Sequence, residues 1–125
     1  MIHLDTSFLV RALIRGTAED RAFRAWVRDG EQLGVSSLAW AQFLSGPVSA
    51  DGARAVAELL EEPLPFGVDD AGVAARLYNE TGRNGSLADC MIAAAAIQAQ
   101  ALLATANVAD FQRFEPMGLR LTISK

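Results

Sequence analysis

Three aspartates stand where a strand is expected to end or a helix to begin. Asp5 closes the apolar run MIHLD, and Asp89 falls early in the helical segment SLADCMIAAAAIQAQ. Asp110 follows the apolar segment LLATA, within TANVADF. Clustered carboxylates repel one another and raise one another's pKa values unless a cation lies between them. Mg²⁺ and Mn²⁺ take oxygen ligands, and a bound metal acidifies water into a nucleophile, so the pattern favours divalent-metal hydrolysis.

Each aspartate also has a purely structural explanation. Asp5 could cap a helix that begins near Thr6, because an aspartate oxygen accepts the free N–H groups of a first turn. The stretch from Ser86 to Asp89 is close to a capping box, and Asp110 could cap the turn DFQRF. Caps need not gather at one edge of a sheet, whereas the ligands of one metal must lie together. The order of strands and helices therefore decides between the two explanations.

The elements that must position these aspartates alternate along the chain. Apolar and periodic segments predict strands over 2–5, 33–36, 63–67, 102–106 and 119–123, and helices over 7–15, 18–29, 38–45, 53–62, 69–83 and 86–100. This alternation predicts one α/β domain over 1–125, a three-layer α/β/α sandwich with a mostly parallel sheet. Ligands bind beyond the carboxyl ends of the strands in such a sheet, and all three aspartates are expected at that edge.

Local signals set several of these boundaries. Thr17, with Asp20 three residues later, predicts a helix start, and Ser37 is the expected cap of the helix over 38–45. A loop rich in Gly, Pro and Ser is expected over 46–52. The strand over 63–67 is weak because it holds two prolines.

The composition restricts the class of protein. The chain has 125 residues, 51% of them hydrophobic, a net charge of −4 and one cysteine. These values exclude a disordered chain and an internal disulfide, and the longest apolar stretch is too short to cross a bilayer. We expect a cytoplasmic protein with no membrane segment and no targeting peptide. The only lysine is Lys125, which argues against haloacid-dehalogenase-like enzymes, response-regulator receivers and P-loop enzymes, because these place a lysine near phosphate.

Four motifs together resemble a PIN domain and, more narrowly, the VapC-like toxins of bacterial toxin–antitoxin pairs. They are LDTS, LAWAQFLSG, DCMIAAAA and TANVADF, and they span the whole chain in order. The resemblance implies an α/β/α sandwich and an endoribonuclease that uses Mg²⁺ or Mn²⁺ to hydrolyse RNA phosphodiester bonds. It also implies a homodimer that is held inactive by a small antitoxin protein encoded beside it.

The resemblance assigns roles to individual residues. Asp5, Asp89 and Asp110 match acidic positions that bind the metal and carry catalysis. The polar positions that hydrogen-bond near the metal or bind it weakly are matched by Ser7, Thr105 and Asn107, and a glycine of the second motif is matched by Gly46.

Gln42 is where the chain departs from the resemblance, which places a glutamate at this position. Glutamine keeps one carbonyl oxygen that can touch a cation or a bound water, but it lacks the charge on which hard-cation affinity depends. We therefore expect weaker metal binding than in a relative with four acids. The same substitution leaves a second interpretation open: a catalytically weakened PIN-like module that binds RNA or the antitoxin without cutting.

Apolar residues on the first two predicted helices are denser than one sheet-facing stripe requires, which predicts an interface as well as a core, in a homodimer that also binds a small antitoxin over this surface. They are Phe8, Leu9, Leu13, Ile14, Phe23 and Trp26. The arginines of these helices are either a solvated face or contacts for RNA or an acidic antitoxin segment. His3 is expected to be a strand residue whose polar atoms are satisfied.

Overall fold

The sheet has four parallel strands. The computed structural model describes residues 1–122, in which the strands are β1 (Ile2–Leu4), β2 (Leu33–Gly34), β3 (Leu102–Ala104) and β4 (Arg120–Thr122). Their order is β2-β1-β3-β4, so the carboxyl ends of β1 and β3 lie side by side at the centre. The predicted α/β fold with a mostly parallel sheet is confirmed. Residue Ile123, the end of the predicted strand 119–123, lies outside the described residues.

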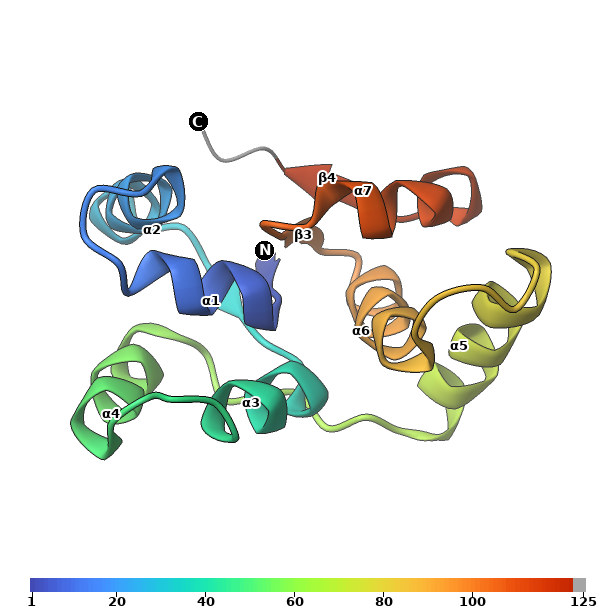
Figure 1. The fold of residues 1–125 in the computed structure, drawn as a ribbon, viewed down its shortest axis with the longest axis horizontal. Helices are drawn as coiled ribbons and strands as arrows, with labels where there is room; N and C mark the ends of the chain where they lie inside the picture. The colour runs from blue at the N-terminus through green and yellow to red at the C-terminus, as the bar shows by residue number, and fades with distance from the viewer. Residues whose placement is uncertain (123–125) are drawn as a thin grey trace.

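Seven α-helices and one 3-10 helix accompany the sheet in the described residues. They are α1 (Thr6–Ala12), α2 (Ala18–Arg28), α3 (Ser37–Leu44), α4 (Ala50–Leu59), α5 (Val68–Glu80), α6 (Leu87–Gln98), α7 (Val108–Phe111) and the 3-10 helix η1 (Gln112–Met117). In Figure 1, α1 and α2 lie to the left of β3, and α5 and α6 lie to its right. Every residue of β1 is buried, and successive side chains of a strand point to opposite faces, so both faces of the sheet are covered. None of the helices between residues 1 and 122 has the length and apolar character needed to cross a membrane.

Of the two helix starts predicted from cap residues, one is correct. Thr17 caps α2 as predicted, because its Oγ1 accepts a hydrogen bond from the Asp20 N–H at 2.9 Å. Ser37 is not the cap of α3 but its first residue. The cap is Ser36, whose Oγ accepts from the Ala39 N–H at 3.1 Å. The prediction selects the wrong one of two adjacent serines, which sequence alone does not distinguish.

The predicted loop over 46–52 is shorter than expected. The helix α4 begins at Ala50 because Ser49 caps it, its Oγ accepting from the Gly52 N–H at 3.0 Å. Gly52 is expected in the loop, yet it lies inside the first turn of the helix. A good cap therefore outweighs the low helix propensity of one glycine.

The predicted strand over 63–67 is almost absent. It is reduced to one bridge between Ser36 and Leu64. Prolines on either side of Leu64 lack an N–H group and cannot extend the ladder.

The helix α6 packs against α5 and β3, and most of its buried residues are alanines. Ala93, Ala94 and Ala96 are fully buried, and Cys90 and Ile92 are buried beside them. Small side chains allow the backbone of a helix to approach its neighbours closely. The run MIAAAAI is therefore a core segment of the domain.

Only part of the predicted interface on the first two helices is exposed. Three of the six residues, Phe8, Leu9 and Phe23, lie in the core that was predicted together with the interface. Trp26 is partly buried and stacks on Phe8, with 5.4 Å between the ring centroids. Leu13 and Ile14 are exposed, at 46% and 52%. The stacked aromatic rings explain part of the apolar density that suggested an interface.

His3 lies inside the sheet, but its polar atoms are not all satisfied as predicted. It is buried, and its Nε2 has no hydrogen-bond partner among the described residues. Burial lowers the pKa of His3, and the N-terminal charge lowers it further. The His3 ring faces Gly34 of the neighbouring strand β2. A Cβ added to Gly34 would lie 3.0 Å from Met1 Sδ and 3.1 Å from His3 Cδ2. Gly34 thus leaves room for a buried imidazole.

The substitutions Gly34→Ala and Gly72→Ala should change stability in opposite directions. Gly34→Ala crowds the His3 ring, which is enclosed in the sheet, and should lower the free energy of unfolding by about 1–2 kcal/mol. Gly72 lies inside α5, and a Cβ added there would meet nothing within 4 Å, so Gly72→Ala should raise that free energy by about 0.5–1 kcal/mol. Urea denaturation measures both changes. A Gly34→Ala variant as stable as the Gly72→Ala variant would contradict the packing described for His3.

Candidate functional site

A pocket of about 620 Å³ opens where the carboxyl ends of β1 and β3 meet the starts of α1, α6 and α7. It is lined by Asp5, Thr6, Ser7, Ala41, Gln42, Ser45, Gly46, Asp89, Ile92, Asn107 and Phe111. Most of the residues assigned from the sequence are therefore brought together. Thr105 and Asp110 are not part of the lining, although both lie close to residues that are.

Asp5 is both a helix cap and a wall of the pocket. Its Oδ1 accepts hydrogen bonds from the Phe8 N–H and from the Ser7 hydroxyl, each at 2.8 Å. The residue is 4% exposed, and burial raises the pKa of its carboxyl group; the negative charge of Asp89 raises it further. Hydrogen bonds from Thr105, Phe8 and Ser7 oppose that rise. The capping explanation is confirmed, and it does not compete with a second role for the same carboxylate.

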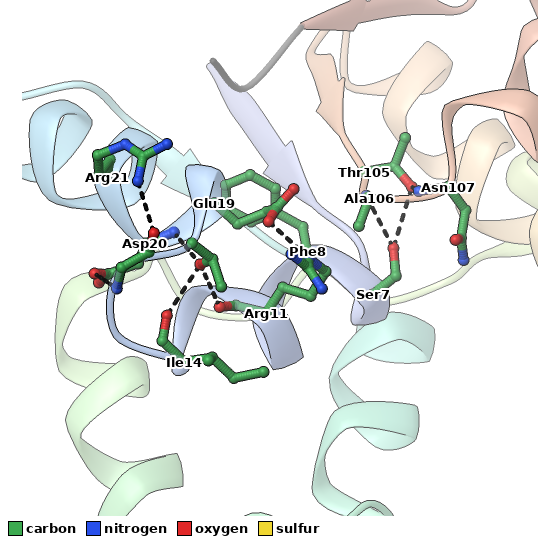
Figure 2. A network of polar contacts seen from close by, with 12 residues as sticks. Ser7, Phe8, Arg11, Ile14, Glu19, Asp20, Arg21, Thr105, Ala106 and Asn107 are labelled. Atoms are coloured by element: carbon green, nitrogen blue, oxygen red, sulfur yellow. Dashed lines mark hydrogen bonds and ion pairs between the residues drawn. The ribbon is translucent and has the colours of Figure 1, made fainter.

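Ser7 and Thr105 join the first turn of α1 to the loop after β3 (Figure 2). Their hydroxyl oxygens are 3.2 Å apart, and Ser7 Oγ also accepts from the Ala106 N–H at 3.1 Å. Thr105 Oγ1 accepts from the Asn107 N–H at 3.0 Å. These bonds fix the two chain segments from which Asp5 and Asn107 reach the pocket. The polar role predicted for Ser7 and Thr105 therefore has a definite set of partners.

Asp89 lies in the first turn of α6, and its carboxylate does not cap the helix. The cap of the helix is Ser86, whose Oγ accepts from the Asp89 N–H at 3.3 Å. Within residues 1–122 the Asp89 carboxylate has no hydrogen-bond partner, and the side chain is half-buried. Burial raises its pKa, the negative charge of Asp110 raises it further, and the positive charge of Arg113 lowers it. The capping of α6 does not need this carboxylate.

Asp110 lies beside the pocket rather than in it. It is exposed in the first turn of α7, and its charge still reaches Asp89. Asn107 precedes the same helix and does line the pocket, without a capping hydrogen bond from its side chain. The described residues contain no group of three His, Cys, Asp or Glu side chains that could together hold a metal ion. A ligand role for Asp110 therefore stays a prediction.

The pair of carboxylates that remains fits a hard divalent cation. Mg²⁺ commonly takes one or two carboxylates, and waters and substrate phosphates fill its other positions. Asp5 and Asp89 line one pocket, and each resists ionisation because of burial and a neighbouring negative charge. A cation between them would favour the ionised form of both.

Gln42 reaches the pocket from α3 and contacts α1. The Thr6 hydroxyl donates a hydrogen bond to Gln42 Oε1 at 2.7 Å and lies 3.2 Å from the Ala39 carbonyl oxygen. Sequence reasoning placed Gln42 at the site but missed Thr6. The available signal was its position directly after Asp5, because a hydroxyl there can reach a neighbouring helix.

Arg113 was also missed. Its guanidinium stacks over Phe114 at 4.6 Å from the ring centroid, and its Nε and Nη2 are buried without a hydrogen-bond partner among residues 1–122. A Cβ on Gly85, which has φ +79°, would overlap this guanidinium. Arg113 therefore places a buried positive charge against the turn that leads into α6. The only signal in the sequence for a charge at this place was the position of Arg113, three residues after Asp110.

A known protein family matches most of this chain. The PIN domain family matches residues 2–115. No curated protein sequence matches the chain closely enough to count as a relative.

Solved structures from three bacteria share the fold. VapBC2 from Rickettsia felis, bound to a DNA fragment from its promoter, has a TM-score of 0.78 at 20% identity, covering 98% of both chains. VapBC-1 from nontypeable Haemophilus influenzae has a TM-score of 0.74 at 21% identity, covering 98% of this chain and 97% of the other. A toxin–antitoxin complex from Klebsiella pneumoniae has a TM-score of 0.71 at 23% identity, covering 89% and 90%. Since the family match spans nearly the whole sequence and these folds agree, the chain belongs to the PIN domain family.

Proposed function

We propose that this chain is a divalent-metal-dependent endoribonuclease that acts on RNA with Mg²⁺ or Mn²⁺. The observation that carries the proposal is the pair Asp5 and Asp89, two carboxylates on one pocket whose ionisation is opposed by burial and by nearby negative charge. Two carboxylates with room for water and phosphate oxygens suit Mg²⁺. PIN-domain proteins are generally nucleases, which supports the same function.

Some residues of the pocket would bind the metal, and others keep those ligands in position. A bound metal would supply an acidified water and neutralise charge on the phosphate under attack. Asp5 and Asp89 would be its ligands, and Asp110 would add negative charge at the edge of the site. Ser7 keeps the Asp5 carboxylate in place through the bond at 2.8 Å. Asn107, on the segment that is hydrogen-bonded to Ser7, would offer polar atoms to a water or a phosphate.

We further propose that the chain is the toxin of a toxin–antitoxin pair and forms a homodimer. A structural neighbour is described as a toxin–antitoxin complex, and this chain has an apolar hollow of about 280 Å³ that another protein could cover. The hollow is lined by Val10, Leu13, Ile14, Phe43, Pro47 and Val48. The side chains of Leu13 and Ile14 are the exposed part of the interface predicted from the sequence.

A second candidate function is favoured by Gln42. A neutral amide stands where the family resemblance places an acid, which suits a PIN-like module that binds RNA or the antitoxin without cutting. Cleavage of RNA by the purified chain, free of any partner and dependent on added metal, distinguishes the two. RNA binding without cleavage would support the second function.

The substitution Asp89→Asn should abolish RNA cleavage and weaken Mn²⁺ binding by more than about tenfold, because it removes one of two charged ligands. In chelator the melting temperature should stay the same or rise, since a repelling charge has been removed. Calorimetric titration, a cleavage assay and thermal melting measure these three effects.

Asp69→Asn is the matched control, because Asp69 is an exposed acid in the first turn of α5 and is absent from the pocket lining. It should leave cleavage and metal affinity unchanged and lower the free energy of unfolding by only about 0.3–1 kcal/mol through the helix dipole. If Asp89→Asn behaves like Asp69→Asn, Asp89 is a structural residue and not a ligand.

Replacing Leu13 and Ile14 by serine should weaken binding of the small protein encoded beside this gene by at least about tenfold, because it removes apolar area at the centre of the contact. The two side chains are exposed, so the fold should survive. Co-purification and titration of the two proteins measure the change.

Val68→Ser is the control, at an apolar side chain that is 89% exposed on α5. Undiminished binding by the Leu13 and Ile14 variant would place the partner elsewhere. Light scattering at tens of micromolar tests the homodimer separately, and a strictly monomeric mass would exclude it.

A further inference from the structure

We propose that Gln42 donates a hydrogen bond from its side-chain amide to the RNA, and does not supply an oxygen to the metal. The inference rests on the proposed nuclease function and assigns this residue a part in substrate binding. Gln42 is exposed to solvent and lines the pocket together with Asp5 and Asp89. It can therefore touch a ligand that enters the pocket without any rearrangement of the core.

Thr6 makes its shorter polar contact with the oxygen end of the Gln42 amide. Thr6 begins α1, directly after Asp5, and its hydroxyl lies 2.7 Å from Gln42 Oε1. The alternative acceptor, the Ala39 carbonyl oxygen, lies farther away at 3.2 Å. Ala39 and Gln42 are three residues apart on α3 and so share one face of that helix. Thr6 thus holds the oxygen of Gln42 toward α1.

The other end of the amide is a donor. A glutamine side chain has one oxygen that accepts and one NH₂ group that donates two hydrogen bonds. Gln42 Nε2 has no hydrogen-bond partner within residues 1–122, so this group is free to bind a ligand. The hydrogens of an NH₂ group carry partial positive charge and are unsuited to contact with a cation. They are suited to phosphate oxygens and to the acceptor atoms of bases.

A glutamate at the same position would do the opposite. Held by Thr6 through one oxygen, it would present a second, negatively charged oxygen to the pocket, which attracts a cation and repels a phosphate. The pair of residues 6 and 42 therefore sets whether this wall of the pocket favours metal or RNA. In this chain it favours RNA.

The experiment compares Gln42→Ala and Gln42→Glu with the wild-type chain in two titrations. Mn²⁺ alone is titrated by calorimetry, and a fluorescein-labelled mixed-sequence RNA oligonucleotide is titrated by anisotropy in chelator. Steady-state cleavage of the same RNA in saturating Mn²⁺ gives KM and kcat separately. Gln98→Ala, an exposed glutamine near the end of α6 and outside the pocket lining, is the matched control.

Gln42→Ala should leave Mn²⁺ affinity within about twofold, weaken RNA binding about fivefold, and raise KM by a similar factor with kcat nearly unchanged. Gln42→Glu should tighten Mn²⁺ binding by about tenfold and weaken RNA binding by more than about tenfold. If Gln42 had only a structural role, its substitution would not raise KM while leaving kcat unchanged. Nor would Gln42→Glu change metal affinity and RNA affinity in opposite directions.

Thr6 provides an independent test of the orientation. Thr6→Val removes the hydroxyl with little change in shape and should weaken RNA binding in the same direction as Gln42→Ala, by about twofold to threefold. Thr6→Ser retains the hydroxyl and should restore wild-type affinity. The melting temperatures of the Val and Ser variants are measured in the same samples. A difference between them would show that the Val substitution disturbs folding.

Three results overturn the proposal. If Gln42→Ala weakens Mn²⁺ binding fivefold or more, Gln42 is an oxygen ligand; if it changes neither titration, Gln42 is a surface residue only. A wild-type chain that binds Mn²⁺ but neither binds nor cleaves RNA overturns the proposed nuclease function, and the donor role with it. The two failures are thus told apart by the behaviour of the wild-type protein.

Discussion

The burial of the Asp5 carboxylate is the constraint around which this end of the molecule is organised. A charged group that is 4% exposed must be held by hydrogen bonds or lose its charge. Here the Phe8 N–H and the Ser7 hydroxyl bind its oxygen, and the Ser7 hydroxyl in turn meets the segment after β3 through Thr105. The first turn of α1 and the loop after β3 are therefore fixed relative to each other by the same group that faces the pocket. Stability and the geometry of the site depend on one set of bonds.

The sequence allowed the site to be predicted where the determining interactions are local. Asp5 and Asp89 each stand at a strand end or a helix start, and the alternation of elements places those positions at one edge of a parallel sheet. The correct cap at Thr17 follows from the same local rule. The error at Ser37 shows the limit of that rule, because Ser36 and Ser37 offer the same hydroxyl and only the path of the chain after β2 selects between them.

Contacts between distant residues could not be predicted. The bond from Thr6 to Gln42 joins positions 36 residues apart, and nothing in either local sequence indicates it. The apolar side chains of α1 and α2 were predicted to form an interface as well as a core, but periodicity does not reveal which of them lie in the core, such as Phe8 beneath Trp26. Arg113 could not be predicted for a related reason: its buried guanidinium lies against Gly85, far away in the sequence, as well as over the neighbouring Phe114 ring.

The alanines of α6 have a consequence for how the protein can tolerate change. An alanine side chain has no rotamers, so Ala93, Ala94 and Ala96 cannot adjust when a neighbour grows or shrinks. A bulkier residue at any of them would shift the helix, and Asp89, one to two turns away at its start, would move with it. Substitutions deep in the hydrophobic interior are thus transmitted to the spacing between Asp5 and Asp89. In this fold, the substitutions that α6 can accept in the core are limited by the geometry that the pocket requires.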